Sequence, residues 1–279
     1  MVLLLDAGNS RLKICLYDTV QKVKPLPELL QMPCEPSLFV QHVVAIDLKE
    51  VETGRRLTQA VSELTEKNPQ MITNVWAVSV SGAHINQRIA DQLKSMGLLV
   101  QWLKPLRSQL GLYNRYSNPD QLGADRWSAA LGLHARFKRP RAPLILANFG
   151  TATTIDTLSN EPSFMGGLIL PGVDMMFDSL AKRTAQLPLA QGAAIDHPTD
   201  TDSAIVSGVL AAQIGALKHQ CDVAFKIFGM APIVCVSGGA WPKVQTAWSL
   251  HVKDITFLHF PHIVLEGLAA VAAENQADH

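Results

Sequence analysis

A short polar turn near the N-terminus has residues suited to binding phosphate groups. The segment consists of Asp6, Ala7, Gly8, Asn9, Ser10, Arg11, Leu12 and Lys13. The turn amides and the small polar side chains can donate hydrogen bonds to phosphate oxygens, and Lys13 adds a positive charge. The Asp6 carboxylate can orient a water molecule bound to magnesium beside the same phosphates. An ordinary hairpin with an aspartate at its strand end is the alternative explanation of the pattern.

A second polar turn in the middle of the chain has the same order of residue types. An apolar run ends at Asn148 and leads into Gly150 and Thr151. Asp6 aligns with Asn148 at an offset of 142 residues (148 minus 6), and Gly8 aligns with Gly150 at the same offset. Two such turns could hold one polyphosphate, although apolar runs before a glycine turn are common enough to coincide. The chain has no Gly-x-x-x-x-Gly-Lys-Ser/Thr motif, which excludes a P-loop.

A third motif begins at Tyr116 and could bind an acidic substrate and accept a proton. Gly123 and Ala124 lead into Asp125 and Arg126 at the expected start of a helix. The Arg126 guanidinium can bind a carboxylate through two parallel hydrogen bonds, while Asp125 can act as a general base. A helix-capping aspartate followed by a surface arginine is the more common structure for such a pair.

These residues require strands before each polar turn and helices after them. Hydrophobic periodicity predicts helices over residues 126–137 and 201–218 and from residue 264 onward, and Gly166-Gly167 predicts a hairpin turn. A small-residue ridge in the second helix, with Ala204 and Gly208 at its start, could pack closely against another helix. A strand–turn–strand segment at the start of each half predicts duplicated α/β domains that face each other across a cleft.

Composition limits the class of protein. At about 150 residues per domain, the 279 residues suggest two domains or one large one. A chain that is 48% hydrophobic and 17% charged is not mainly disordered. Lys+Arg and Asp+Glu number 24 each, so a generally basic nucleic-acid-binding surface is not expected. The longest mostly apolar stretch, residues 204–217, is too short to span a membrane, and four cysteines without a Cys-x-x-Cys pair suit a reducing compartment. We therefore expect a cytoplasmic protein that binds neither nucleic acid nor membranes.

Taken in order, these motifs resemble those of the type III pantothenate kinases, the Bvg accessory factor-like family of the acetate and sugar kinase/Hsp70/actin superfamily. Residues 6–13 resemble the first phosphate motif of the family, and Gly150-Thr151-Ala152 resembles the second. Tyr116-x-x-Pro119-x-x-Leu122-Gly123-x-Asp125-Arg126 resembles its substrate motif. Gly166-Gly167-x-Ile169-x-Pro171-Gly172 and Thr201-x-x-Ala204-Ile205-x-x-Gly208 match as well. The resemblance covers nearly the whole chain, although residues 18–110 contain no diagnostic motif.

The resemblance implies an α/β fold with two duplicated ribonuclease H-like (actin-like ATPase) domains that face each other across a central cleft. We place the N-terminal domain, with the first phosphate hairpin, at residues 1–115. The C-terminal domain, with the substrate motif and the second phosphate hairpin, is then residues 116–279. Family members also resemble homodimers, and the small-residue ridge is the expected contact surface.

By the same resemblance, the protein phosphorylates pantothenate with ATP, the first step of coenzyme A biosynthesis. Asp125 would be the general base. Residues 6–13 and Thr151 would bind ATP with Mg²⁺. The substrate-binding residues would be Tyr116, Gly123, Ala124, Asp125, Arg126 and Thr201. Phosphoryl transfer needs positioning and charge neutralisation more than covalent catalysis, which such a set can supply.

One position departs from the family pattern, and two other functions remain open. The family commonly has an aspartate where this chain has Asn148, and that aspartate is associated with a bound monovalent cation, K⁺ or NH₄⁺. Asparagine keeps a carbonyl ligand without the charge, so we expect K⁺ or NH₄⁺ to bind more weakly here. A non-catalytic regulatory accessory factor and a related small-molecule kinase are the alternative functions. Intact Asp6, Lys13, Asp125 and Arg126 argue against the first, and the substrate motif argues against the second.

Overall fold

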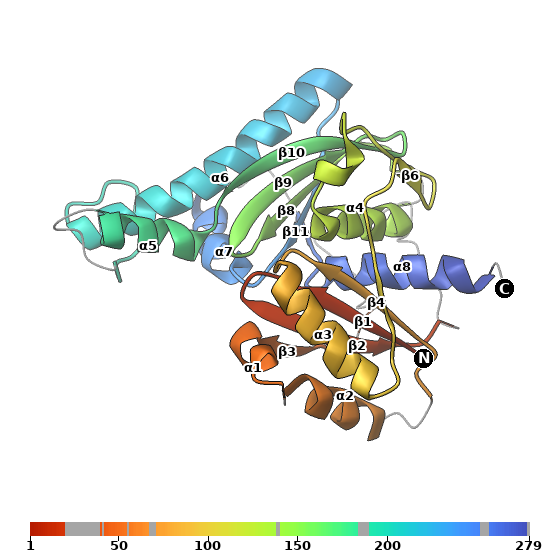
Figure 1. Cartoon of the computed structure of the whole chain (residues 1–279). Coiled ribbons are helices and arrows are strands. Elements are labelled where there is room, and N and C mark those ends of the chain that lie inside the picture. Colours follow the sequence, from red (N-terminus) through yellow and green to blue (C-terminus); the bar gives the residue numbers. More distant parts are fainter. Residues whose placement is uncertain are drawn as a thin grey trace. The chain divides into compact units, whose positions relative to one another are not determined.

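The computed structural model describes residues 1–19, 40, 42–54, 56–66, 71–137, 140–183, 190–251 and 257–277 (Figure 1). These residues form two compact units. The first contains the described residues up to 137 together with those from His262 onward, and the second contains those from 140 to Pro261.

A sheet of strands in the order β3-β2-β1-β4-β5 forms the centre of the first unit. The strands are β1 (Val2–Ala7), β2 (Arg11–Tyr17), β3 (Val44–Asp47), β4 (Asn74–Ser79) and β5 (Val100–Trp102). Strand β1 pairs antiparallel with β2 and parallel with β4. The helices α1 (Leu48–Glu52), α2 (Arg56–Glu66) and α3 (Ala83–Ser95) bury their apolar faces in the same core as β1 and β2.

The sheet of the second unit repeats this arrangement. Its strands β8 (Leu144–Phe149), β9 (Ala152–Leu158), β10 (Ser163–Pro171), β11 (Ile233–Ser237) and β12 (Phe257–His259) follow the order β10-β9-β8-β11-β12. Strand β8 pairs antiparallel with β9 and parallel with β11, as β1 does with β2 and β4. The helices α5 (Val173–Arg183), α6 (Thr201–Phe228) and α7 (Trp241–His251) belong to this unit. The expected duplication of an α/β domain is therefore confirmed.

The first strand of each sheet shows why the two polar turns have the same sequence pattern. Both β1 and β8 have four buried residues, one half-buried residue and a further buried residue. The half-buried positions are Asp6 and Asn148. A central strand covered on both faces is apolar along its length, so its polar group can lie only near its end.

Two further helices of the first unit, α4 (Ala124–Arg136) and α8 (Ile263–Ala277), pack side by side at very short distance (Figure 1). A Cβ atom on Gly132 would lie 2.6 Å from the Ile263 carbonyl oxygen, and one on Gly267 would collide with the Ser128 carbonyl oxygen. The Ser128 hydroxyl donates a hydrogen bond of 2.8 Å to the Val264 carbonyl. Glycine at two positions thus allows the two backbones to touch.

A buried ion pair also joins α4 to α8. The Arg136 guanidinium donates to both carboxylate oxygens of Glu266, at 2.7 and 3.1 Å, and the two side chains are only 1% and 2% exposed. This packing places α4 and α8 in the first compact unit, with β1 and β4. The compact units thus divide near residue 138, whereas the sequence placed the domain boundary at residue 115. The boundary of the duplicated domains stays a prediction, because compactness does not identify the duplicated segments.

A short hairpin precedes α4 in the first unit. It consists of β6 (Ser108–Gln109) and β7 (Leu112–Asn114), and its turn has positive φ at Leu110 (52°) and Gly111 (80°). The Trp127 indole nitrogen on α4 donates to the Gln109 side chain at 2.9 Å, and a ring nitrogen of His134 contacts the Leu110 carbonyl at 3.1 Å. The hairpin is therefore tied to α4.

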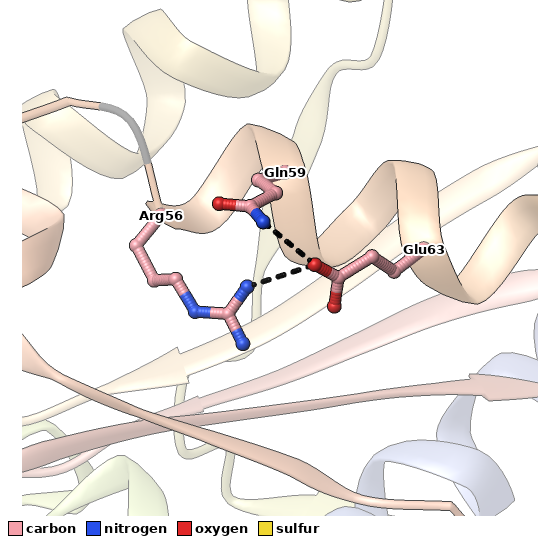
Figure 2. A network of polar contacts seen from close by, with 3 residues as sticks. All are labelled: Arg56, Gln59 and Glu63. Carbon is pink, nitrogen blue, oxygen red and sulfur yellow. Dashed lines mark hydrogen bonds and ion pairs between the residues drawn. The ribbon is translucent and has the colours of Figure 1, made fainter.

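The outer surface of α2 carries a polar network of three residues (Figure 2). Arg56 and Gln59 both donate to one carboxylate oxygen of Glu63, at 3.2 and 2.8 Å. Because the Arg56 and Glu63 side chains are 33% and 44% exposed, this ion pair contributes little to stability.

Two details of the structure differ from the sequence-based expectations. Gly166-Gly167 does not form a hairpin turn but lies within β10, where the pairing with β9 shifts register between Phe164 and Gly166. Helix α6 continues ten residues beyond residue 218, to Phe228, because it ends only at Gly229, which has φ of 71°.

Within the part of the chain that the structure describes, no helix combines the length and the apolar character needed to cross a bilayer.

Candidate active site

The first segment predicted to bind phosphate is the β1–β2 hairpin. Asp6 lies directly opposite Lys13 in the antiparallel register, and the Lys13 ammonium is 4.0 Å from the Asp6 carboxylate. The Gly8 amide closes the turn by donating to the Arg11 carbonyl at 3.0 Å. Two of the predicted residues, Ala7 and Leu12, have side chains buried in the core, so only their backbone is available to a ligand. The side chains that remain available are those of Asp6, Asn9, Ser10, Arg11 and Lys13.

The carboxyl group of Asp6 holds its proton more tightly than an ordinary aspartate. Burial raises its pKa to about 6, the ammonium of Lys13 opposes this shift, and the carboxylate of Asp125 adds to it. Asp6 and Asp125 are 119 positions apart in the sequence, but both belong to the first unit and influence each other electrostatically. The fold thus brings the first phosphate hairpin and the substrate motif close enough for their charged groups to interact.

Asp125 lies in the first turn of α4, which begins directly after Gly123. One oxygen of its carboxylate accepts a hydrogen bond of 2.8 Å from the Arg126 amide. A Cβ atom on Gly123 would lie 2.7 Å from that same oxygen, so a glycine is needed here for the carboxylate to keep its position. Burial raises the pKa of Asp125, while the amide and guanidinium of Arg126 lower it. A partly desolvated carboxylate with a raised pKa is suited to general-base catalysis near neutral pH.

Tyr116 and Arg126, the first and last residues of the predicted substrate motif, contact each other. The Arg126 side chain is 5% exposed, and its Nη1 donates a hydrogen bond of 2.8 Å to the Tyr116 hydroxyl. Its guanidinium carbon also lies 5.7 Å from the centre of the Tyr116 ring, within the range of a cation–π contact. A desolvated guanidinium held in this way has a fixed orientation for binding a carboxylate.

The loop that carries Tyr116 is held by two residues that no sequence motif indicated. The Arg107 side chain donates three hydrogen bonds to backbone carbonyls of this loop. Asn114, which is 1% exposed, accepts a hydrogen bond of 3.0 Å from the Tyr116 amide. Arg107 lies in the segment where the sequence showed nothing diagnostic, and only the contacts identify it.

The second turn predicted to bind phosphate joins β8 to β9 in the second unit. Asn148 lies opposite Thr154 in the antiparallel register, and the Gly150 amide donates to the Ala152 carbonyl at 3.2 Å. Thr151 is exposed at the turn. The Gly172 amide donates to the Thr151 carbonyl at 3.1 Å, and a Cβ atom on Gly172 would lie only 2.5 Å from that oxygen. The last glycine of the motif that ends β10 therefore supports the turn.

Thr201, the remaining substrate-binding candidate, is the first residue of α6. Asp200 caps this helix by accepting a hydrogen bond of 2.8 Å from the Ser203 amide. Thr201, Asn148 and Thr151 belong to the second unit, whereas the other candidate residues all lie in the first.

The donor set of the first unit is compatible with a magnesium–nucleotide complex. Among the described residues, no three His, Cys, Asp or Glu side chains are grouped to hold a metal ion. Mg²⁺ is usually held by one or two carboxylates, waters and substrate phosphates, so a single carboxylate such as Asp6 meets its needs. A nearby cation would also favour the charged form of this carboxyl group, whose pKa burial has raised.

Solved structures with similar folds match nearly the whole chain. A Baf family transcriptional activator from Campylobacter jejuni matches with a TM-score of 0.58 at 16% identity, over 99% of both chains. A 2-dehydro-3-deoxygalactonokinase from Sinorhizobium meliloti matches with a TM-score of 0.53 at 13% identity, again over 99% of both chains. At these identities the similarity establishes the fold alone.

Sequence comparison identifies the family. The type III pantothenate kinase family model matches residues 2–223. The type III pantothenate kinase of Bordetella bronchiseptica is 40% identical over 287 aligned positions, which cover 99% of this chain and 98% of the relative. That of Aromatoleum aromaticum is 36% identical and covers 99% and 100% of the two chains. The chain belongs to the type III pantothenate kinase family.

The coupling of Asp6 to its neighbours predicts a pattern of titration. In ¹³C NMR of aspartate carboxyl carbons, the Asp6 signal should have a titration midpoint near pH 6. This midpoint should be lower in Asp125→Asn and higher in Lys13→Met. Because this pKa exceeds the unfolded value of about 3.9, ionisation of Asp6 opposes folding and stability falls as pH rises from about 4 to about 6. Asp91→Asn, on α3, is the control and should leave the signal unchanged. A wild-type midpoint near pH 4 would contradict this assignment.

Proposed function

We propose that the protein transfers the γ-phosphoryl group of ATP to the primary hydroxyl of pantothenate, the first step of coenzyme A biosynthesis. The observation that carries the proposal is the desolvated Asp125 carboxylate next to the Tyr116–Arg126 pair. The hydroxyl oxygen forms a bond to the γ-phosphorus while the bond from that phosphorus to the β–γ bridging oxygen breaks, which releases ADP. The hydroxyl proton passes to Asp125.

Pantothenate has a carboxylate at one end and the reacting hydroxyl at the other. We assign its carboxylate to the buried guanidinium of Arg126, which the Tyr116 hydroxyl orients. Gly123 and Ala124 would line the substrate at the start of α4, beside Asp125. Thr201 would contribute from the start of α6. Holding both ends of the substrate supplies the positioning on which phosphoryl transfer depends.

We assign the ATP phosphates to residues 6–13 and Thr151. Lys13 would neutralise phosphate charge, and Asp6 would orient a water of the bound magnesium. Mg²⁺, when bound, neutralises charge on the β- and γ-phosphates. Use of ATP, together with buried free thiols at Cys15, Cys221 and Cys235, supports a location in the cytoplasm. A purely regulatory role would not require the electrostatic coupling between Asp6 and Asp125.

Asn148 supports a distinct proposal about monovalent cations. Its position at the end of β8 corresponds to that of Asp6 at the end of β1, but its side chain is neutral. A K⁺ or NH₄⁺ ion here would have only neutral protein oxygens and the ligand phosphate as ligands. Hard cations prefer charged oxygens, so we propose that this chain depends on such an ion less sharply than relatives that carry aspartate.

The surface of α6 supports a homodimer. The small residues Ala204, Gly208, Ala212 and Gly215 are all exposed on this helix. Among the described residues, no atom outside α6 lies within 4 Å of the positions that Cβ atoms on Gly208 and Gly215 would occupy. Phe225, further along the helix, is 56% exposed. We propose that a second copy of the chain packs on this ridge, since two-fold contacts are the commonest in soluble oligomers.

Replacing the proposed base tests the chemistry. Asp125→Asn should lower kcat by about 10²–10⁴-fold, because a base contributes that much, while folding and ATP binding stay close to wild type. A coupled assay of ADP release with pantothenate measures the loss, and Asp120→Asn, an exposed aspartate of the same motif, is the control. Retention of more than about half the activity would disprove the assignment.

Sedimentation tests the proposed dimer. At micromolar concentration the protein should sediment as a species of twice the 30.4 kDa chain mass. Gly208→Arg should shift it towards monomer, because the added side chain has room in the single chain but not in a close helix–helix contact. A wild-type protein found only near 30.4 kDa would refute the dimer.

Restoring a carboxylate tests the cation proposal. Asn148→Asp should sharpen the dependence of turnover on K⁺ or NH₄⁺, because it supplies a charged oxygen ligand. Titration of KCl against turnover, at constant ionic strength, compares the variant with the wild type. Identical half-saturation in the two proteins would show that neutral oxygens dominate and would reject the proposal.

A further inference from the structure

Arg107 makes an unusual concentration of contacts with the loop that carries Tyr116. Its Nη1 donates to the Asn114 carbonyl at 2.9 Å and to the Tyr116 carbonyl at 2.7 Å, and its Nη2 donates to the Ser117 carbonyl at 3.0 Å. Hydrogen bonds from a charged donor are about twice as strong as neutral ones. One side chain thus holds three carbonyls within four consecutive residues.

The loop has little regular structure of its own. Residues 115–118 lie between β7 and the short 3₁₀ helix Pro119–Gln121 and belong to neither. The Asn114 amide donates to the Arg107 carbonyl at 2.9 Å, and the Asn114 side chain accepts from the Tyr116 amide at 3.0 Å. Arg107 and Asn114 therefore both hold the backbone at Tyr116, one at its carbonyl and the other at its amide.

We propose that Arg107 is a positioning residue for pantothenate, acting through Tyr116. By fixing the loop backbone, it holds the Tyr116 hydroxyl where it accepts the hydrogen bond from Arg126 and so orients that guanidinium. The inference rests on the proposed function of Tyr116 and Arg126 as substrate-binding residues. Arg107 donates its bonds to backbone carbonyls, so its role does not depend on direct contact with the substrate.

The geometry requires arginine rather than any cation. A guanidinium is a planar fork with five donors, and it can reach three carbonyls at once. A lysine ammonium is a compact charge on a flexible stem, and it would reach one or two of them without fixing their relative positions. Arg107→Lys therefore keeps the charge but removes the fork. Because residue 107 is exposed, the variant should fold as the wild type does.

The effect should fall on pantothenate binding rather than on the chemical step. Tyr116 contacts Arg126, whereas Asp125 is held separately by the Arg126 amide and by its place in α4. A loss of binding that is equal in ground state and transition state raises KM and leaves kcat unchanged. The three hydrogen bonds from the Arg107 side chain go to residues 114–117 and none goes to the β1–β2 hairpin, so KM for ATP should not change.

The experiment compares Arg107→Lys with Arg88→Lys in steady-state kinetics of the full-length protein. Arg88, on α3, is a matched control because its guanidinium also donates to a backbone carbonyl, that of Glu52, but holds no candidate site residue. Arg107→Lys should raise KM for pantothenate by about tenfold, with kcat and KM for ATP within about twofold of wild type. Arg88→Lys should leave all three constants near wild type.

Hydrogen exchange of the amides of residues 113–118 gives a readout that does not depend on activity. These amides should exchange faster in Arg107→Lys than in wild type or Arg88→Lys. A wild-type protein that does not phosphorylate pantothenate would overturn the proposed function itself. Wild-type turnover combined with an unchanged pantothenate KM, or with a fall in kcat alone, in Arg107→Lys would overturn only the role of Arg107.

Discussion

The direct backbone contact between α4 and α8 is the constraint on which the site depends. Gly132 and Gly267 leave no room for a side chain, and the Arg136–Glu266 ion pair fixes the two helices in rotation as well as in distance. Because α8 also packs on β1, the position of α4 relative to the first phosphate hairpin is set in the same unit. Asp125 and Arg126 occupy the first turn of α4, so the location of the proposed base follows from a contact made by the C-terminal helix.

Removal from water gives Asp6, Asp125 and Arg126 the properties on which the proposed chemistry depends. Asp6, Asp125 and Arg126 would be ordinary ionised groups on an exposed surface, with little mutual influence. Burial raises the pKa of both aspartates, and the Asp6 carboxyl responds to Asp125 as well as to Lys13. The arginine, 5% exposed, is kept in position by the Tyr116 hydroxyl. Because burial disfavours the charged form of each group, a bound ligand of opposite charge would stabilise it, and so would transfer of a proton to an aspartate.

The two sheets show how duplication and divergence combine. Their strand orders and their hairpin registers correspond, and Asp6 and Asn148 occupy the same place at the end of the first strand. The shared backbone follows from the shared pattern of apolar strand and polar turn. The charge differs because the residue at this place differs. Asp6 has a carboxylate suited to magnesium, whereas Asn148 has a neutral amide. In each unit the residue after the third strand supports the turn through its amide, which Leu48 donates to the Ser10 carbonyl and Gly172 to the Thr151 carbonyl, both at 3.1 Å.

The sequence alone determined the duplication, the two hairpins and the start of α4, because these depend on local hydrophobic periodicity and on short motifs. It also identified the family, which the matching model and relatives confirm. The contacts between distant segments could not be read from it. The interruption of β10 by a register shift rather than a turn, the α4–α8 packing and the coupling of Asp6 to Asp125 were decided by tertiary structure. The clearest case is Arg107, which no local pattern distinguishes from other surface arginines. Its three carbonyl partners come together only when the β6–β7 hairpin folds back beside it, and a hydrogen bond depends on that proximity in space.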